Sequence, residues 1–263
     1  MTKDLLEQYL NQGKSTREIA KLVGKSRSTV SYYIHKYKLQ DKMQNKTFKE
    51  YGTPYHFNKI DSKEKAYTLG FILGDGCVHY NNELIVNVNL YDKEVVDFIS
   101  KEIDSKVLTS TKVNIKKRIY PHAITSKKVV DILKFTGGRL KQDRHYPKVP
   151  KHLERYLLLG FFDAEGCITY GIRKDRNRLW HKISFTSQYR LLEGIQTMLL
   201  NNIGIATKIH PKTGDKCFVL EFANKKDVYK FITYLYKDDF YVLKRKYIKA
   251  NALRLELEEI GEK

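Results

Sequence analysis

The sequence has little cysteine and no long apolar run. Its three cysteines, Cys77, Cys167 and Cys217, lie far apart and form no Cys-x-x-Cys pair, so neither a disulfide framework nor a cysteine zinc site is expected. No run of about 18 apolar residues is present to cross a membrane, and the first residues lack the apolar core of a secretory signal peptide. We therefore expect a reducing, cytoplasmic compartment.

Acidic residues are also few in relation to basic ones. The 263 residues include 49 Lys and Arg against 30 Asp and Glu, which leaves a net charge of +19. Such an excess of cations favours a polyanion as partner, and nucleic acid is the first candidate because neutralised phosphates release counterions. A generally basic protein without this partner is the alternative. The 19 Tyr and 12 Phe residues indicate a packed core rather than disorder.

The first 40 residues contain three short helical patterns that together resemble a helix-turn-helix. Ser15 or Thr16 can cap the second helix and Ser26 the third, and Gly24 separates the two. The third helix would enter the major groove of DNA. The expected contacts at its exposed start are Arg27, Ser28 and Ser31. A small helical bundle without a ligand is the alternative, and residues 41–60 follow as a polar, basic linker.

The rest of the chain contains an internal repeat. The segment LGFILGDGCVHY at 69–80 returns as LGFFDAEGCITY at 159–170, an offset of 90 residues. Alternating patterns predict strands near residues 77–80, 84–90, 106–109 and 112–125, and again near 167–173, 180–187, 205–210 and 217–222. Helices are predicted near 92–104, 126–136, 189–202, 224–237 and 240–258. The predicted fold class is α+β, in two tandem αββαββα halves at residues 61–150 and 151–263.

Each repeated segment predicts a helix that ends at a glycine, as the position after a helix prefers. Small residues recur four apart in both helices, which lets two backbones approach closely. If the helices pack side by side, Asp75 and Glu165 come together at their ends. Two such carboxylates repel each other and oppose the helix dipoles. A divalent metal would offset this cost, and between carboxylates and phosphates it can activate water.

The segments 68–76 and 158–166 resemble the LAGLIDADG signature of homing endonucleases. In that family the acid before the final glycine of each copy binds metal and cuts one DNA strand. The resemblance covers roughly residues 61–258 and implies a DNA-binding saddle with Asp75 and Glu165 as metal-binding catalytic acids, using Mg²⁺ or another divalent cation such as Mn²⁺. The first copy departs at Leu73, where the second keeps Asp163; that position is usually structural.

The resemblance implies further catalytic residues. A lysine after the last strands of each half often enters a basic pocket around the scissile phosphates, and Lys141 and Lys244 are the candidates, with Lys246 as an alternative. A polar residue at the end of the second strand often orients a water, which points to Asp92 and Gln188. The competing interpretations are a solvated basic helix start for either lysine and a helix N-cap for Asp92.

The alternating strands predict a sheet with one apolar and one polar face. Two-stranded ribbons fit the major groove and read base edges. The expected DNA contacts are Asn87, Asn89, Lys112, Asn114, Lys116, Lys182, Ser184 and Thr186, with Arg173, Arg176 and Arg178 from the long hairpin of the second half. Ordinary solvated strand surface is the alternative for each single residue.

The expected function is a double-strand break in a long asymmetric site of double-stranded DNA. A monomer is expected, because two halves already supply the pseudo-two-fold axis that homodimers build from two chains. A non-cutting DNA-binding regulator and an RNA-splicing maturase of the same fold remain open as alternatives, and the presence of both acids favours cutting. The helix-turn-helix favours a bacterial or phage-infected bacterial cell.

Overall fold

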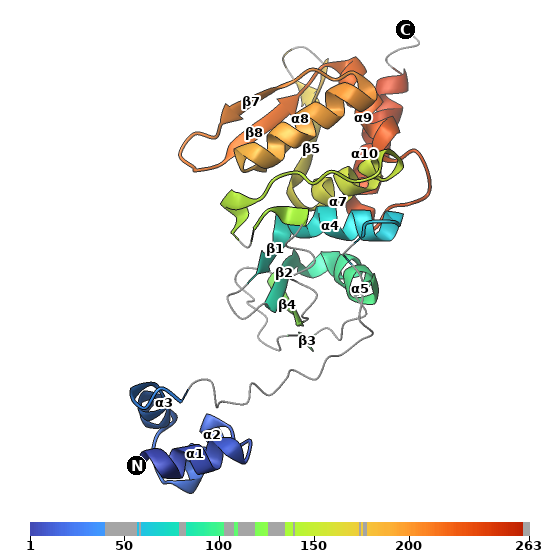
Figure 1. Cartoon of the computed structure of the whole chain (residues 1–263). Helices are drawn as coiled ribbons and strands as arrows, with labels where there is room; N and C mark the ends of the chain where they lie inside the picture. Colours follow the sequence, from blue (N-terminus) through green and yellow to red (C-terminus); the bar gives the residue numbers. More distant parts are fainter. Residues whose placement is uncertain are drawn as a thin grey trace. The chain divides into compact units, whose positions relative to one another are not determined.

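The computed structural model describes residues 1–39, 57, 59–78, 83–102, 108–109, 119–125, 135–138, 140–173, 175 and 178–259. The chain forms two compact units, Met1–Tyr51 and Gly52–Lys263, which are coloured along the sequence in Figure 1. Several predicted features lie outside the described residues: most of the linker, the greater part of the helix at 126–136, the residues Lys112, Asn114, Lys116 and Arg176, and the side chain of Asn87.

The first unit has the three expected helices, α1 (Lys3–Asn11), α2 (Thr16–Leu22) and α3 (Arg27–Lys36). Ser15 forms a capping box with Glu18 at the start of α2, and the Ser26 side chain accepts from the Thr29 N–H at the start of α3. The apolar faces close over one small core: Leu6, Leu10, Ile19, Ala20, Val30, Ile34 and Leu39. The predicted helices and caps are thereby confirmed.

The first half of the second unit is built around one antiparallel sheet. Its elements are α4 (Lys63–Asp75), β1 (Gly76–Val78), β2 (Glu83–Asn89), the short 3-10 turn η2 (Leu90–Asp92), α5 (Lys93–Glu102), β3 (Leu108–Thr109) and β4 (Ile119–Thr125). The strand order is β1-β2-β4-β3. The buried side chains of β2 are those of Leu84, Val86 and Val88, which confirms the predicted alternation.

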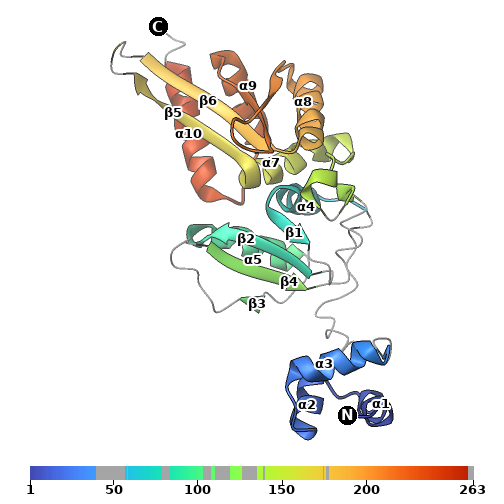
Figure 2. The same cartoon turned by 90° about the vertical axis from the view of Figure 1, so that its left-hand side faces the viewer.

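The second half repeats this plan. After two short turns, η3 (Lys141–Asp143) and η4 (Lys151–Leu153), come α7 (Glu154–Glu165), β5 (Gly166–Arg173), β6 (Arg178–Ser187), α8 (Tyr189–Ile203), β7 (Lys208–Pro211), β8 (Phe218–Phe222), α9 (Lys225–Leu235) and α10 (Lys244–Glu259). The strand order β5-β6-β8-β7 matches that of the first sheet. Helices α8, α9 and α10 contact strands of this sheet, and Figure 2 shows them beside it. The α+β class and the two related halves are confirmed.

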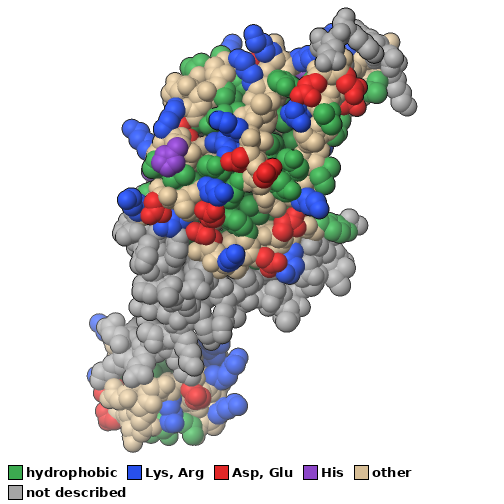
Figure 3. All heavy atoms as spheres, turned by 90° about the vertical axis from the view of Figure 1, so that its right-hand side faces the viewer, with side chains coloured by type: hydrophobic (Ala, Val, Ile, Leu, Met, Phe, Trp, Pro, Cys, Tyr) green, Lys and Arg blue, Asp and Glu red, His purple; other side chains and the backbone are tan. Residues whose placement is uncertain are grey.

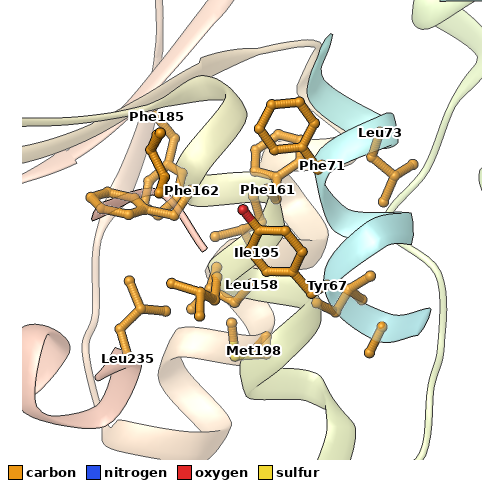
Figure 4. Packing of buried hydrophobic residues seen from close by; sticks show 14 of the residues in the cluster. Tyr67, Phe71, Leu73, Leu158, Phe161, Phe162, Phe185, Ile195, Met198 and Leu235 are labelled. Atoms are coloured by element: carbon orange, nitrogen blue, oxygen red, sulfur yellow. The ribbon is translucent and has the colours of Figure 1, made fainter. Parts of the chain in front are cut away.

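The two halves meet through α4 and α7, the pair of elements in most extensive contact. A Cβ added at Gly70 would collide with the carbonyl of Leu157, and one added at Gly160 with the carbonyl of Tyr67, so only glycine allows this approach. Aromatic and aliphatic side chains of both helices fill the surrounding core (Figure 4). The small residues predicted to bring the helices together therefore do so.

One buried polar contact also joins the halves. The Tyr67 hydroxyl on α4 donates to Asp163 Oδ2 on α7 at 2.7 Å, and both side chains are buried. Burial raises the pKa of Asp163 to about 7. This buried, hydrogen-bonded position agrees with the structural role expected for Asp163.

Within the described part of the chain, no helix is long and apolar enough to cross a membrane.

Candidate active site

The two repeated helices deliver one acid each to a common point. Asp75 is the last residue of α4 and Glu165 the last residue of α7. A Cβ at Gly74 would lie 2.5 Å from the Ala164 Cβ and 2.8 Å from the Glu165 Cγ, so the final turns are in direct contact. The juxtaposition of Asp75 and Glu165 predicted from the repeat is present.

The glycines that follow the acids end the helices in a different way from the one expected. Gly76 has φ −70° and ψ 130°, and Gly166 has φ −83° and ψ 150°, so neither is left-handed. A Cβ at Gly76 would lie 2.5 Å from the Ile72 carbonyl oxygen, and one at Gly166 would enter the Phe162 ring. Glycine is needed here because strands β1 and β5 leave the helices through a crowded corner.

Asp75 is in an unfavourable environment for a charged carboxylate. Burial, and next the negative charge of Glu165, raise the pKa of Asp75 to about 7. The positive charges of Lys141 and Lys246 act in the opposite direction without cancelling the effect. A cation placed between the two carboxylates would relieve this repulsion.

The three candidate lysines have three different surroundings. The Nζ of Lys141 lies 3.3 Å from Glu165 Oε1, so the first half sends a cation to the acid of the second. Lys244 is exposed, and its backbone N–H donates to Glu94. Lys246 is buried and donates to the carbonyls of Phe162, Asp163 and Gly166 at 2.5–2.8 Å. Because its amine is buried and bound to backbone carbonyls, Lys246 is not placed to contact a DNA phosphate.

Asp92 has a structural partner. Its carboxylate is only 6% exposed and accepts two hydrogen bonds from the Arg245 guanidinium at 2.6 and 2.7 Å. The geometry is bidentate and charge-assisted, which is the strong form of this contact. The contact holds the start of α5 against the start of α10, and Asp92 stands immediately before Lys93, the first residue of α5.

The strand register gives Gln188 a different counterpart. Val86 pairs with Gly76, as Phe185 pairs with Gly166, and three residues further on stand Asn89 and Gln188. Asn89 is exposed and caps η2 by accepting from the Tyr91 N–H at 3.2 Å. Gln188 is half-buried at the start of α8, with its Nε2 3.8 Å from Cys217 Sγ. In strand register Asn89 therefore corresponds to Gln188, whereas Asp92 shares with Gln188 the position directly before the next helix.

The second sheet has the predicted polar face. Ile183 and Phe185 on β6 are buried, whereas Ser184 and Thr186 are half-buried on the other side. Among the described residues of these strands, the cations on this face are Arg173, Arg178, Lys182 and Lys208. Arg173 and Arg178 are exposed and paired in register, and Lys182 lies 2.9 Å from Glu221. The side of the body seen in Figure 3 instead mixes acidic, basic and apolar side chains.

The sequence analysis missed an aromatic side chain on this polar face. Trp180 is 41% exposed and pairs in register with Gly171. Because glycine has no side chain, the indole can lie close to the backbone of β5. Its even position on β6, between Arg178 and Lys182, was the signal that would have found it.

In the first unit, two of the three predicted DNA contacts have internal partners. Arg27 Nε donates to Thr16 Oγ1 at 3.3 Å, and the Ser28 hydroxyl lies 2.7 Å from that of Ser26. Ser31 is half-buried, and the neighbouring Tyr32 is 61% exposed. Arg27, Ser28, Ser31 and Tyr32 all belong to α3.

Comparison with known proteins agrees with both units. Residues 5–36 match a family model described as a helix-turn-helix domain, and residues 152–236 match one described as a LAGLIDADG-like domain. The chain joins a helix-turn-helix domain to a body with the LAGLIDADG fold. A comparison with curated proteins gives no match.

Solved LAGLIDADG structures share the fold of the body. The homing endonuclease I-LtrWI bound to target DNA is 11% identical, with a TM-score of 0.58 over 76% of this chain and 91% of that one. The meganuclease I-AabMI bound to uncleaved DNA is 14% identical, with a TM-score of 0.53 over 74% and 91%. I-SmaMI bound to cleaved DNA is 11% identical, with a TM-score of 0.53 over 78% and 92%. At such identities the likeness establishes the fold.

Proposed function

We propose that the chain is a divalent-metal-dependent DNA endonuclease that makes a double-strand break at a specific, asymmetric site. The observation that carries this proposal is the meeting of Asp75 and Glu165 at the touching ends of α4 and α7. The raised pKa of Asp75 means that the fold maintains this pair at a cost, and such costs cluster at functional sites.

The residues present fit a hard divalent cation. Asp75 and Glu165 offer carboxylate oxygens, which Mg²⁺ and Mn²⁺ prefer. No cluster of three or more His, Cys, Asp or Glu side chains occurs within the described ranges, so phosphate and water oxygens would complete the coordination, as is common for Mg²⁺. When bound, the metal would activate water and stabilise the leaving oxygen.

Three of the chain's own residues would support this chemistry. Lys141, beside Glu165, would place a positive charge where negative charge develops on the scissile phosphate. Asn89 and Gln188, at matching ends of β2 and β6, carry amides that can orient a water or a phosphate oxygen. These roles are part of the proposal.

The polar face of the sheets would bind the target. Arg173, Arg178 and Lys182 would contact phosphates and guanines, and Ser184 and Thr186 would contact base edges. The solved structures with the same fold include complexes with target and cleaved DNA, which supports DNA binding by the body. The helix-turn-helix would supply a second, tethered DNA contact that raises affinity through effective concentration.

The proposal is tested on the full chain. A target is first selected from a randomised DNA library and cloned into a plasmid. Supercoiled, nicked and linear forms are then scored with Mg²⁺ and with EDTA for the wild type, Asp75→Asn, Glu165→Gln and, as a matched surface control, Asp97→Asn. We expect the wild type and the control to linearise the plasmid only with Mg²⁺, and both acid variants to bind but lose at least about a hundredfold in rate.

Three results would reject the proposal in different ways. Binding of the selected DNA without cleavage by the wild type would favour a DNA-binding regulator with the same fold. Wild-type linearisation by a folded Asp75→Asn or Glu165→Gln variant would remove these acids from the metal site. Binding that requires a structured RNA instead of the selected DNA would favour a maturase.

A further inference from the structure

At the C-terminal end of each repeated helix, a buried cation from elsewhere in the chain donates to backbone carbonyls. Arg144 is 1% exposed, and its Nη1 donates to the carbonyls of Ile72 and Leu73 at 3.2 and 3.1 Å. Lys246 is 8% exposed and donates to the carbonyls of Phe162 and Asp163 at 2.5 and 2.8 Å. The first cation therefore closes α4 and the second closes α7.

The two contacts are equivalent under the internal repeat. Ile72 and Leu73 occupy the same positions of the repeated segment as Phe162 and Asp163. In each turn the backbone N–H of the cation donates to the carbonyl three residues earlier, that of Lys141 or of Leu243. Chemically different side chains thus reach equivalent carbonyls in the two halves, and the property they share is a positive charge with N–H donors.

The ends of these helices need such a charge. The last carbonyls of a helix, here those of Leu73 and Asp163, have no backbone partner within it and carry the negative end of its dipole. The carbonyls of Ile72 and Phe162 also accept from the N–H groups of Gly76 and Gly166. Here the helix also ends in a carboxylate, Asp75 or Glu165, which adds charge of the same sign. Burying a cation is costly unless it is paired, and the carbonyl bonds of Arg144 Nη1 and of Lys246 Nζ offset this cost. Each cation therefore fixes the backbone one turn from an acid.

We propose that Arg144 and Lys246 are positioning residues, which hold the last turns of α4 and α7 so that Asp75 and Glu165 stand in the geometry that cutting requires. This inference rests on the proposed function. Because each cation serves one helix, each should affect the strand that depends on the acid of that helix. Neither side chain is exposed for contact with DNA, so the effect is on the cutting step and not on binding.

The test compares strand-specific cutting rates. Single-turnover rates on a target labelled on both strands are measured for Arg144→Met and Lys246→Met, with Asp75→Asn and Glu165→Gln showing which strand depends on which acid. The matched control is Arg155→Met: Arg155 is also buried and donates to a helix-terminal carbonyl, that of Leu235 at 3.0 Å, but on α9. DNA affinity and thermal unfolding are measured for every variant.

We expect each Met variant to cut its own strand at least about tenfold more slowly than the other strand, with unchanged DNA affinity. Arg155→Met should lose stability and keep the wild-type strand ratio. Arg144→Lys and Lys246→Arg each introduce the cation that the other half uses, and both variants should keep the wild-type ratio of the two strand-cutting rates. Where a Met variant does not fold, the Gln variant, which retains an amide donor, replaces it.

The outcomes separate the two proposals. If the wild type does not cut, the proposed function is wrong. If the wild type cuts but the folded Arg144 and Lys246 variants slow the cutting of both strands equally, the positioning role is wrong. Equal slowing is the result expected from a loss of stability alone. A change in DNA affinity in place of a change in cutting rate would also reject it.

Discussion

Replacing Asp75 with asparagine should stabilise the LAGLIDADG body near neutral pH. The pKa of Asp75 is about 7 in the folded protein, against an ordinary value of 3.8. Between these values the unfolded chain has lost the proton and the folded chain has kept it, so the folded state binds more protons. The stability of the wild type therefore falls as the pH rises through this range. Asparagine does not titrate and escapes this fall.

The size of the effect follows from the shift. About three pKa units correspond to a ceiling of about 4 kcal/mol at 1.36 kcal/mol per unit. Asp75 keeps some contact with solvent, which reduces the expected gain to about 1–3 kcal/mol at pH 8. For a domain of this size each kcal/mol moves the midpoint of thermal unfolding by roughly 2–4 °C.

The assay is urea unfolding at pH 5, 6, 7 and 8. The single tryptophan, Trp180, lies on β6, so its fluorescence reports on the body and not on the helix-turn-helix unit. The difference between Asp75→Asn and wild type should grow with pH, whereas Asp97→Asn, which removes an exposed acid paired with Lys93, should show none. Mg²⁺ should stabilise the wild type and leave Asp75→Asn unchanged. A constant difference from pH 5 to pH 8 would refute the reasoning.

Three further outcomes are expected. Removing residues 1–40 should weaken DNA binding and leave metal-dependent cutting at saturating protein; complete loss of cutting by the folded fragment would contradict this. Gly160→Ala should destabilise the body by about 3 kcal/mol or more, because its Cβ meets the Tyr67 backbone, whereas Gly171→Ala, whose nearest neighbour is the movable Trp180 indole, should cost far less in urea unfolding. Light scattering on the DNA complex should give the mass of one chain plus one DNA duplex, and the mass of two chains plus one duplex would exclude the monomer.

The repeat could be predicted because its information is local. Small residues four apart, an acid and a final glycine lie within one helix turn or two of each other, and the packing of α4 against α7 follows from their size. Strand alternation is equally local, and the burial of Leu84, Val86 and Val88 was expected for that reason.

Residues that depend on tertiary register could not be predicted in the same way. The hairpin of the second half is longer than that of the first, so the sequence offset that aligns the repeated helices does not align the ends of the second strands. In strand register, Asn89 is the residue that corresponds to Gln188. The partner of Asp92 is Arg245, far along the chain. No sequence pattern marks such an ion pair, because it forms only when α5 and α10 are brought together.

The lysines show the same limit. Lys141 and Lys244 have similar sequence neighbours, yet it is Arg144 and Lys246 whose side chains donate to equivalent carbonyls of α4 and α7. Only the burial of Arg144 and Lys246 separates cations that hold the backbone from a cation, Lys141, that faces an acid.

The bond between Tyr67 and Asp163 has a consequence for the ancestry of the chain. A symmetric protein made of two copies of the second half would set Asp163 against Leu157, the residue that matches Tyr67 in the repeat, and would bury a carboxyl without its donor. Two copies of the first half would set Tyr67 against Leu73 and bury a hydroxyl without its acceptor. Either orphaned group costs about 1–3 kcal/mol at each of two sites. The halves have thus diverged into complementary parts, and neither can be duplicated to rebuild the whole without a compensating change.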